Sequence, residues 1–325
     1  MKKYYSLILF FYLVCSVNIN AQSNFPFLPE NNLERLPFLD FFGPSFNVID
    51  FNSLSNYHFF NSYAFNPAMA GIEDKRQINF DWNRQVNHSA SLSYEQPIAN
   101  INSAIGVQYE YSDKSYGKIH RYGLAYNYAF RWKENSQLRI GAQISQVNVK
   151  IDEFSYFLLE GDKWYSFPSL DFGLAFQYKQ LRLGASVQNL VPKEYATFNI
   201  ITEDFTNQVK TVRIVNISAA NTFRLSKKWD WSLAFLLRFN SQEVISDYYY
   251  YYEYGSNRSR HDLSSYFSFQ KKWTIGMTYR TQFDPVWIGF VGVKLKEKLN
   301  LQLSFNTKKD SYEPRFWEVL TQYQF

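Results

Sequence analysis

Hydrophobic and polar residues alternate along the stretch from Phe167 to Leu190. In its first half the apolar positions are Leu170, Phe172, Leu174, Phe176 and Tyr178, and between them lie Asp171, Gly173, Ala175 and Gln177. A period of two places the apolar set on one face of a β-strand. After a tight turn at 179–180, Leu181, Leu183, Ala185 and Val187 alternate with Arg182, Gly184, Ser186 and Gln188. The pattern predicts a β-hairpin with one apolar face and one polar, glycine-containing face.

Such a hairpin fits two kinds of protein. In a soluble sandwich the apolar face packs on a second sheet, whereas in an outer-membrane barrel it faces lipid and the polar face lines a lumen. The recurrence of the pattern favours the barrel. We expect fourteen strands, at 77–85, 89–97, 101–112, 117–133, 136–149, 168–179, 181–190, 210–225, 228–240, 261–271, 272–282, 285–296, 298–307 and 315–325.

The connections between these segments also alternate. Every second one is short and polar or basic, at 97–100, 133–136, 179–180, 226–228, 271–272 and 296–298. The others include long ones near 150–167, 191–209 and 241–260. Transmembrane barrels have short periplasmic turns and longer extracellular loops. An even strand number places both barrel ends on the short-turn side.

The last expected strand ends the sequence on an aromatic residue. Trp317, Val319, Thr321, Tyr323 and Phe325 fall on one face of it. A terminal Phe that closes an alternating strand resembles the signal read by the outer-membrane barrel-assembly machinery. We therefore expect Tyr323 and Phe325 to act as an assembly signal.

Composition agrees with a barrel. No segment after the first 21 residues has the roughly 18 uninterrupted apolar residues of a helical membrane span. Aromatics nevertheless make up 20% of the residues, with 26 Tyr, 31 Phe and 8 Trp. Half-polar strands keep the average hydropathy modest, and aromatic girdles at both membrane interfaces raise the aromatic content.

Residues 1–21 have the features of a secretory signal peptide. Lys2 and Lys3 precede an apolar run, and cleavage is expected after Ala21. Cys15 lies in this run after Val14, where a lipoprotein signal would have a small residue, so we expect no lipidation and a mature chain without cysteine. The formal net charge of +5 becomes +3 without the two lysines. Nothing in this charge indicates nucleic-acid binding.

The segment 22–76 precedes the predicted barrel at 77–325. Its part from residue 24 to 65 is rich in Phe and Pro, and its prolines argue against helix or central strand. The segment is too apolar for a free linker. We expect it to pack in the lumen, at the barrel mouth or on a partner, with Phe38, Phe41, Phe42 and Phe46 as candidate partner-docking residues. The alternative is a partly ordered leader.

A short motif, Asn66-Pro67-Ala68-Met69-Ala70-Gly71, ends this segment. Asn-Pro favours a turn, and Gly71 can adopt a positive φ just before the first strand. With the Tyr/Phe-rich run before it, the motif resembles the start of the PorP/SprF family. Two departures are Met69, where the family commonly has Tyr, and the long Phe/Pro leader.

The resemblance covers nearly the whole chain after residue 56. Its other carriers are the hairpin at 172–190 and the strand at 271–280 with the following Asp284-Pro285. It implies an outer-membrane protein associated with type IX secretion and gliding motility. The motif residues carried over are Asn66, Pro67, Ala68, Ala70 and Gly71.

No motif for catalysis or metal binding is present. The histidines His58, His88, His120 and His261 are scattered, and none has a second ligand at metal-binding spacing. We expect no enzymatic activity and no cofactor. The longest external connection carries candidate surface-loop binding residues, which fit a protein or glycan surface or else an interfacial aromatic belt: Tyr248, Tyr249, Tyr250, Tyr251, Tyr252, Arg258 and Arg260.

The polar face of the predicted strands carries both signs of charge, which favours an occluded lumen over an ion-selective one. This lumen-facing set comprises Asn79, Asp81, Asn83, Glu110, Asn127, Arg131, Asp171, Arg182, Asp230, Arg238 and Arg280.

Three functions remain open from the sequence. The first is a non-enzymatic barrel that takes part in type IX secretion, or in surface attachment of secreted adhesins, by docking partner proteins. Its partners would be outer-membrane lipid, type IX components or a secreted adhesin, and the assembly machinery during insertion, with no nucleic acid. The second is a channel for small hydrophobic compounds, similar to the long-chain fatty-acid transporter family. The third, a barrel enzyme, needs a catalytic triad that no motif proposes.

Overall fold

The fold is taken from a computed structural model that describes residues 48–49, 60–84, 88–114, 117–133, 135–151, 163–191, 194–199, 206–211, 213–241, 259–281, 286–306 and 317–325. The chain divides into a unit Met1–Gly43 and a unit Pro44–Phe325, and the described residues all lie in the second. Within the described ranges, no helix has the length and apolar character needed to cross a membrane.

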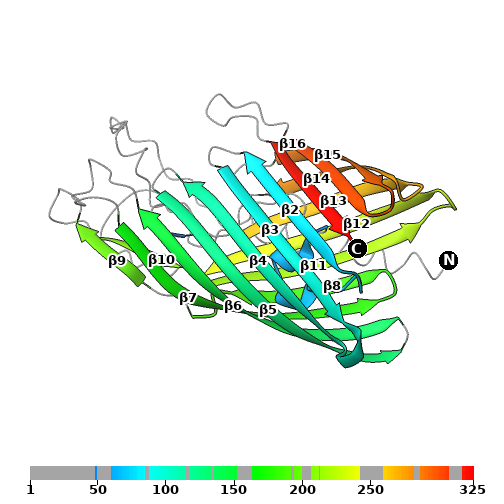
Figure 1. The fold of residues 1–325 in the computed structure, drawn as a ribbon. Helices are drawn as coiled ribbons and strands as arrows, with labels where there is room; N and C mark the ends of the chain where they lie inside the picture. The colour runs from blue at the N-terminus through cyan, green and yellow to red at the C-terminus, as the bar shows by residue number, and fades with distance from the viewer. Residues whose placement is uncertain are drawn as a thin grey trace, which may run out of the picture. The chain divides into compact units, whose positions relative to one another are not determined.

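Fourteen antiparallel strands close into a barrel, which confirms the predicted fold class (Figure 1). Strands β2 to β8 follow the chain, and β8 then pairs with β11, the first of seven further strands that return to β2. Their bounds are β2 Gln77–Arg84, β3 His88–Ile98, β4 Ser103–Lys114, β5 Gly117–Lys133, β6 Ser136–Ile151, β7 Lys163–Tyr178, β8 Leu181–Gln188, β11 Arg213–Arg224, β12 Trp229–Ser241, β13 Ser259–Phe269, β14 Trp273–Thr281, β15 Val286–Leu295, β16 Leu299–Asn306 and β17 Trp317–Gln324.

The connection expected at 191–209 contains additional structure. The strands β9 (Glu194–Asn199) and β10 (Thr206–Thr211) form an antiparallel pair, and β1 (Val48–Ile49) adds to β10 in parallel. The connection near 150–167 is shorter than expected because β6 extends to Ile151 and β7 begins at Lys163. The strands β9 and β10 were not predicted because, with six residues each, they are too short to show the alternation expected of a barrel strand.

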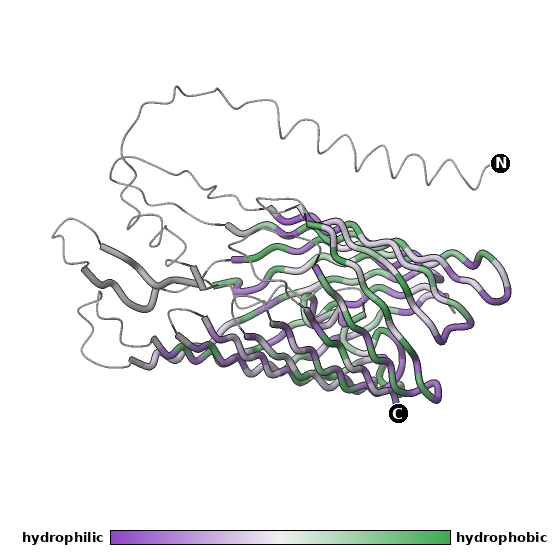
Figure 2. Tube along the Cα trace, turned by 90° about the horizontal axis from the view of Figure 1, so that it is seen from above, coloured by the Kyte–Doolittle hydropathy of each residue, from purple (hydrophilic) through white to green (hydrophobic). Residues whose placement is uncertain are grey.

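Side chains alternate between the two faces of the barrel wall as predicted. On β7, Leu174 is 40% exposed on the outer face, whereas Ala175 is 2% exposed on the inner face. On β8, Leu183 is exposed, and Ser186 and Gln188 are buried. The alternation of apolar and polar positions along the strands is visible in Figure 2. Of the predicted lumen set, Asn79, Asp81, Asn83, Asn127, Asp171, Arg238 and Arg280 are buried.

The short turns bring non-glycine residues into the left-handed region of φ. Gln270 and Lys271 have φ values of 52° and 55°, and Lys296 and Glu297 have 49° and 58°. Two consecutive positive φ values are those of a type I′ turn, whose twist matches that of the flanking strands. The end of the barrel with these turns is called the short-turn end, and the opposite end the long-connection end.

The first and last barrel strands meet at the short-turn end. β17 pairs with β2 from Trp317 opposite Arg84 to Gln324 opposite Gln77. The main-chain N–H of Phe325 donates to the carbonyl of Arg76 at 3.1 Å, and the Tyr323 and Phe325 rings meet edge-on at 4.9 Å. Both barrel ends therefore lie on the short-turn side, as expected for an even strand number.

Candidate functional site

The segment from Phe60 to Ile72 lies inside the barrel and carries the Asn-Pro-Ala-Met-Ala-Gly motif. It contains two single-turn 3-10 helices, η2 (Ser62–Ala64) and η3 (Pro67–Met69), drawn in blue within the ring of strands in Figure 1. Every residue from Phe65 to Ile72 is buried. We call Phe60–Ile72 the plug.

Asn66 joins the plug to the barrel wall. Its backbone is extended, and its side-chain Oδ1 accepts a hydrogen bond from the N–H of Ala68 at 2.9 Å, which caps η3. Pro67 occupies the first helical position, where a missing N–H has no cost. The Nδ2 of the same Asn66 side chain donates to the carbonyl of Leu174 at 2.9 Å and to that of Ala185 at 3.2 Å. One carboxamide thus orders the motif and binds both β7 and β8.

Glycines in the wall allow the plug this close approach. A Cβ at Gly141 of β6 would lie 2.6 Å from the backbone nitrogen of Ala68, and one at Gly184 of β8 would lie 2.6 Å from Met69 Cε. At Gly106 of β4 it would lie 2.5 Å from the Tyr63 ring. Contacts below 3.0 Å need a shift, so these glycines form a seat for the plug. We call Gly106, Gly141, Gly173 and Gly184 the glycine seat.

Polar side chains of the wall hold the end of the motif. The Nδ2 of Asn127 donates to the carbonyl of Ala70 at 2.9 Å, and Arg139 Nη1 donates to the same carbonyl at 3.0 Å. Gly71 has φ 65°, which confirms the predicted positive φ, and its N–H donates to Glu95 Oε2 at 2.6 Å. The backbone groups of Ala70 and Gly71, which follow η3, therefore have hydrogen-bond partners in the wall although they are not part of a helix or strand.

The beginning of the plug packs on the opposite side of the barrel. The Phe60 ring lies 5.3 Å from that of Tyr266 and edge-on at 6.2 Å from that of Phe290. Gln322 donates to the Phe60 carbonyl at 3.3 Å, and Ser186 Oγ donates to that of Phe65 at 2.6 Å. The plug therefore crosses the lumen from β13, β15 and β17 to β8.

Tyr63 is the largest side chain of the plug that reaches the wall. Its ring lies over Gly106, and only 2% of the residue is exposed. Burial, reinforced by the nearby carboxylate of Glu95, raises the pKa of the Tyr63 hydroxyl above its ordinary value. The side chain therefore contributes as a neutral, mostly apolar group.

Ion pairs fasten the chain between the plug and β2. Glu73 Oε1 lies 2.6 Å from Arg182 Nη1, and Asp74 Oδ1 lies 2.6 Å from Arg131 Nη2. These side chains are partly exposed, so water screens the pairs and each contributes little to stability. The buried hydrogen bonds and the glycine seat carry most of the attachment.

Two clusters of charged residues line the lumen, and each of them contains both positive and negative side chains. In one, Arg121 is paired with Asp171, which also accepts a hydrogen bond from the N–H of Asn189 at 3.0 Å. In the other, Asp262 lies between Arg260 and Arg280. Paired charges of this kind agree with the expectation of an occluded lumen. The described residues contain no group of His, Cys, Asp and Glu side chains that could hold a metal ion.

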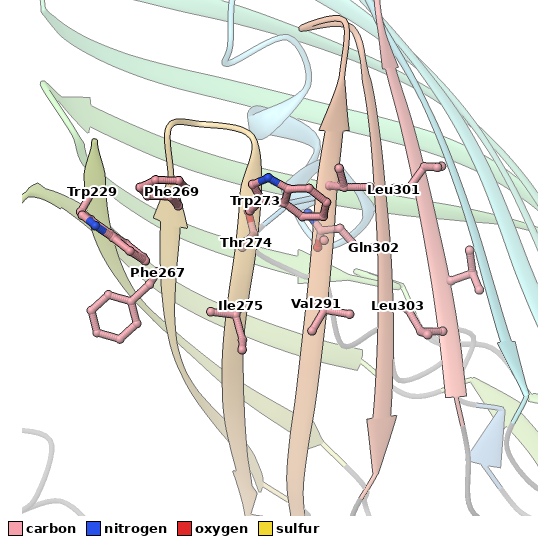
Figure 3. Close-up of a pocket in the computed structure, with 13 residues that line it drawn as sticks. Trp229, Phe267, Phe269, Trp273, Thr274, Ile275, Val291, Leu301, Gln302 and Leu303 are labelled. Atoms are coloured by element: carbon pink, nitrogen blue, oxygen red, sulfur yellow. The ribbon is translucent and has the colours of Figure 1, made fainter. Parts of the chain in front are cut away.

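The outer face carries an apolar groove across β12 to β17 (Figure 3). Trp273 and Ile275 are 54% and 59% exposed there. An exposed apolar surface on the outside of a membrane barrel is the surface that lipid covers. The groove is also lined by Trp229, Phe267, Phe269, Val291, Leu301 and Leu303.

The predicted site residues have different positions in the structure. It brings the motif residues Asn66, Pro67, Ala68, Ala70 and Gly71 together in the plug. The docking candidates Phe38, Phe41, Phe42 and Phe46, and the loop residues Tyr248–Tyr252 and Arg258, lie outside the described residues. Arg260 belongs to β13 and is 3% exposed, so its assignment to the surface loop is wrong.

Several residues that contact the plug were not predicted from the sequence. Glu95 and Arg139 were absent from the predicted lumen set, although both fall on the polar face of their strands. The available signal was the glycine on that face in four strands, β4, β6, β7 and β8, because glycine weakens a strand unless another backbone approaches it closely.

Comparison with solved structures finds other barrels of bacterial outer membranes. A Pseudomonas aeruginosa FadL homologue matches with a TM-score of 0.51 and 11% identity, over 81% of this chain and 94% of that chain. The Pseudomonas putida toluene transporter TodX matches with a TM-score of 0.49 and 9% identity, over 80% and 92%. At such identities the likeness shows the fold alone.

Comparison of the sequence with family models identifies the chain. A search of curated proteins finds no match. The model described as type IX secretion system membrane protein PorP/SprF matches residues 50–323, which include the plug and all of the barrel except the last residue of β17. Fold and family together place the protein in the outer membrane, with its short turns on the periplasmic side. The chain belongs to the PorP/SprF family of type IX secretion system membrane proteins.

Proposed function

We propose that this protein is a non-enzymatic, plugged barrel that takes part in type IX secretion, or in surface attachment of the secreted proteins, by docking partner proteins. The observation that carries the proposal is the plug. It crosses the lumen and binds β3 to β8 on one side and β13, β15 and β17 on the other. A lumen occupied in this way supports a docking role over a permanently open pore.

The alternative is a channel for small hydrophobic compounds. Its support is a barrel of the same strand number and the general likeness to transporters, which concerns the fold alone. Conductance in planar bilayers separates the two functions. We expect the purified protein to show no stable open channel, and robust open channels would favour the alternative.

The secretion role is tested in cells that lack the protein. The readout is the amount of a type IX client at the cell surface relative to the amount retained in the periplasm. Loss of the protein is expected to raise the retained fraction, and the wild-type chain to restore surface display. Normal display in the absence of the protein would overturn the secretion role.

Docking through the Phe-rich segment is tested in the same cells. A variant with Phe38, Phe41, Phe42 and Phe46 all replaced by Ser is expected to assemble in the outer membrane but not to restore display, since it lacks the apolar contact surface. The matched control replaces Asn31 and Asn32 by Ser and is expected to restore it. Full restoration by the four-Ser variant would exclude these phenylalanines as the docking surface.

A further inference from the structure

The apolar groove on the outer face of the barrel begins at the short-turn end. Trp229 and Trp273 are the first residues of β12 and β14, and each follows directly on a short turn. Phe269 pairs with both of them, so the three aromatic side chains form one row of the groove nearest the rim. Ile275 and Val291 lie farther from the β13–β14 turn (Figure 3). Because tryptophan side chains of membrane proteins gather at the headgroup level, the groove extends from that level into the hydrocarbon.

The groove is hollow because smaller side chains follow the aromatic ones around the barrel. Beyond Trp273 the row nearest the rim continues with Val293 and Leu301. The next row contains Ile275, Val291, Leu303 and Val319. On β5, in contrast, exposed outward-facing positions carry the large aromatic side chains Tyr122, Tyr126, Tyr128, Phe130 and Trp132. The groove has a volume of about 770 Å³ and an apolar lining, and this volume is in the range of sites that hold small molecules.

Lysines are concentrated at the rim beside the groove. The three short turns at 226–228, 270–272 and 296–298 contain six exposed lysines and one acidic residue, Glu297. The lysines are Lys227, Lys228, Lys271, Lys272, Lys296 and Lys298. The N–H of Gln270 donates to the carbonyl of Lys228 at 2.6 Å, which joins the first two turns. The Nζ of Lys272 lies 5.8 Å from the centre of the Trp273 ring, within the range of a cation–π contact. A positive charge therefore lies at the opening of an apolar groove.

We propose that the groove binds one anionic glycerophospholipid of the periplasmic leaflet, with an acyl chain in the groove and the phosphate headgroup at the lysines of the rim. The leaflet follows from the position of the short turns on the periplasmic side. The hydrocarbon chain matches the apolar lining, and the headgroup matches the excess of positive charge. Lipid elsewhere around the barrel meets the first of these surfaces without the second. The proposal does not rest on the role in secretion.

Lipid titration of the purified full-length protein tests the headgroup. Native mass spectrometry gives the dissociation constants of phosphatidylglycerol and of phosphatidylethanolamine with the same acyl chains. We expect one phosphatidylglycerol to bind to each barrel more tightly than phosphatidylethanolamine. Equal affinity would indicate adventitious lipid only and would overturn the proposal.

A double variant tests the lysines. Lys271→Gln with Lys272→Gln removes two charges beside the groove, and the turn is expected to persist because Gln270 already adopts a φ of 52° there. Phosphatidylglycerol should bind about 25-fold more weakly, at roughly fivefold for each lysine near an anionic headgroup. The matched control, Lys118→Gln with Lys179→Gln, removes the same charge on β5 and at the β7–β8 turn. Equal weakening by the two double variants would overturn the proposal.

A larger side chain in the groove tests the place of the acyl chain. Val291→Trp adds bulk on an outward-facing position of the groove, and Leu174→Trp makes a similar change on the outer face of β7. Both variants keep an apolar residue against lipid, so both are expected to fold, as shown by heat-modifiable gel mobility. Val291→Trp should lose the preference for phosphatidylglycerol, whereas Leu174→Trp should keep it. Wild-type binding by Val291→Trp would overturn the proposal.

A photo-cross-link identifies the occupant in the membrane. The photoreactive residue p-benzoylphenylalanine replaces Val291, the cells are irradiated, and the mass of the purified protein is measured. We expect an adduct with the mass of a phospholipid. A polypeptide adduct would show that a protein segment occupies the groove and would overturn the proposal. None of these measurements uses secretion, so their failure is distinct from failure of the proposed function.

Discussion

Gly173 of β7 lies directly against the carboxamide of Asn66, so that a Cβ at residue 173 would overlap Asn66 Oδ1. The same oxygen accepts the hydrogen bond from Ala68 N–H that caps η3. Because Gly173 has no side chain, Asn66 has room to adopt the position in which it caps η3. The conformation of the plug therefore depends on this residue of the wall.

Replacement of Gly173 by Ala is expected to displace Asn66 and to destabilise the seated plug by about 1–3 kcal/mol, the usual cost of overpacking. The measurement is the rate at which protease cleaves the plug in the purified barrel. The control is Gly123→Ala, where the added Cβ would come 2.8 Å from Nε2 of Gln143, the flexible end of a side chain. Equal protection of both variants would contradict the seat.

Two substitutions of Asn66 separate its two roles. Asn66→Asp keeps an oxygen for the N–H of Ala68 but cannot donate to Leu174 and Ala185, whereas Asn66→Ala loses all three hydrogen bonds. At about 0.5–1.5 kcal/mol per hydrogen bond, Asn66→Ala should cost roughly 1.5–4.5 kcal/mol. Asn66→Asp should lower the stability of the protein by a comparable amount, because the carboxylate charge would face the carbonyl oxygens of Leu174 and Ala185. Both are read from the temperature at which heat-modifiable gel mobility is lost. Wild-type behaviour of Asn66→Asp would show that the wall contacts are unimportant.

The lipid-facing assignment of β7 predicts unequal effects of a new charge. Leu174→Arg places a guanidinium on the exposed outer face and should cost about 2–4 kcal/mol near the bilayer midplane. Gln177→Arg, on the inner face near the short turn, should be mild, because the side chain there already donates to the carbonyl of Lys179 at 3.4 Å. Folded fraction in gels without boiling measures both, and equal losses would refute the assignment.

Deletion of Tyr323 to Phe325 is expected to block assembly without changing export to the periplasm. The deletion removes the pairing of Tyr323 with Ile78 and of Gln324 with Gln77, and the bond from Phe325 N–H to Arg76. Strand ends would then lie unpaired at the membrane. Fractionation of cells gives the result. A truncated protein that is folded in the outer membrane at normal level would show that these residues are dispensable.

The sequence by itself determined the barrel. The type and number of the barrel strands follow from the period-two pattern. Each side chain of the wall faces either lipid or the lumen, and its odd or even position along the strand decides which. For this reason the hairpin at Leu174 and Ala185 and the turn at Lys179 were predicted at the right residues. The positive φ of Gly71 was also readable, since glycine adopts it without strain.

Only the tertiary structure decided where the plug lies and what holds it. Asn66 contacts Leu174 and Ala185 across 108 and 119 residues of sequence, and no local pattern encodes a pairing over such distances. The glycines of the seat indicate in the sequence that another segment approaches them closely, but which segment this is becomes visible only with Ala68 and Asn66 against them. The pairing of Val48 with Lys210 is likewise non-local. Local periodicity determines strands, whereas the contents of the lumen depend on which distant residues the closed barrel brings together.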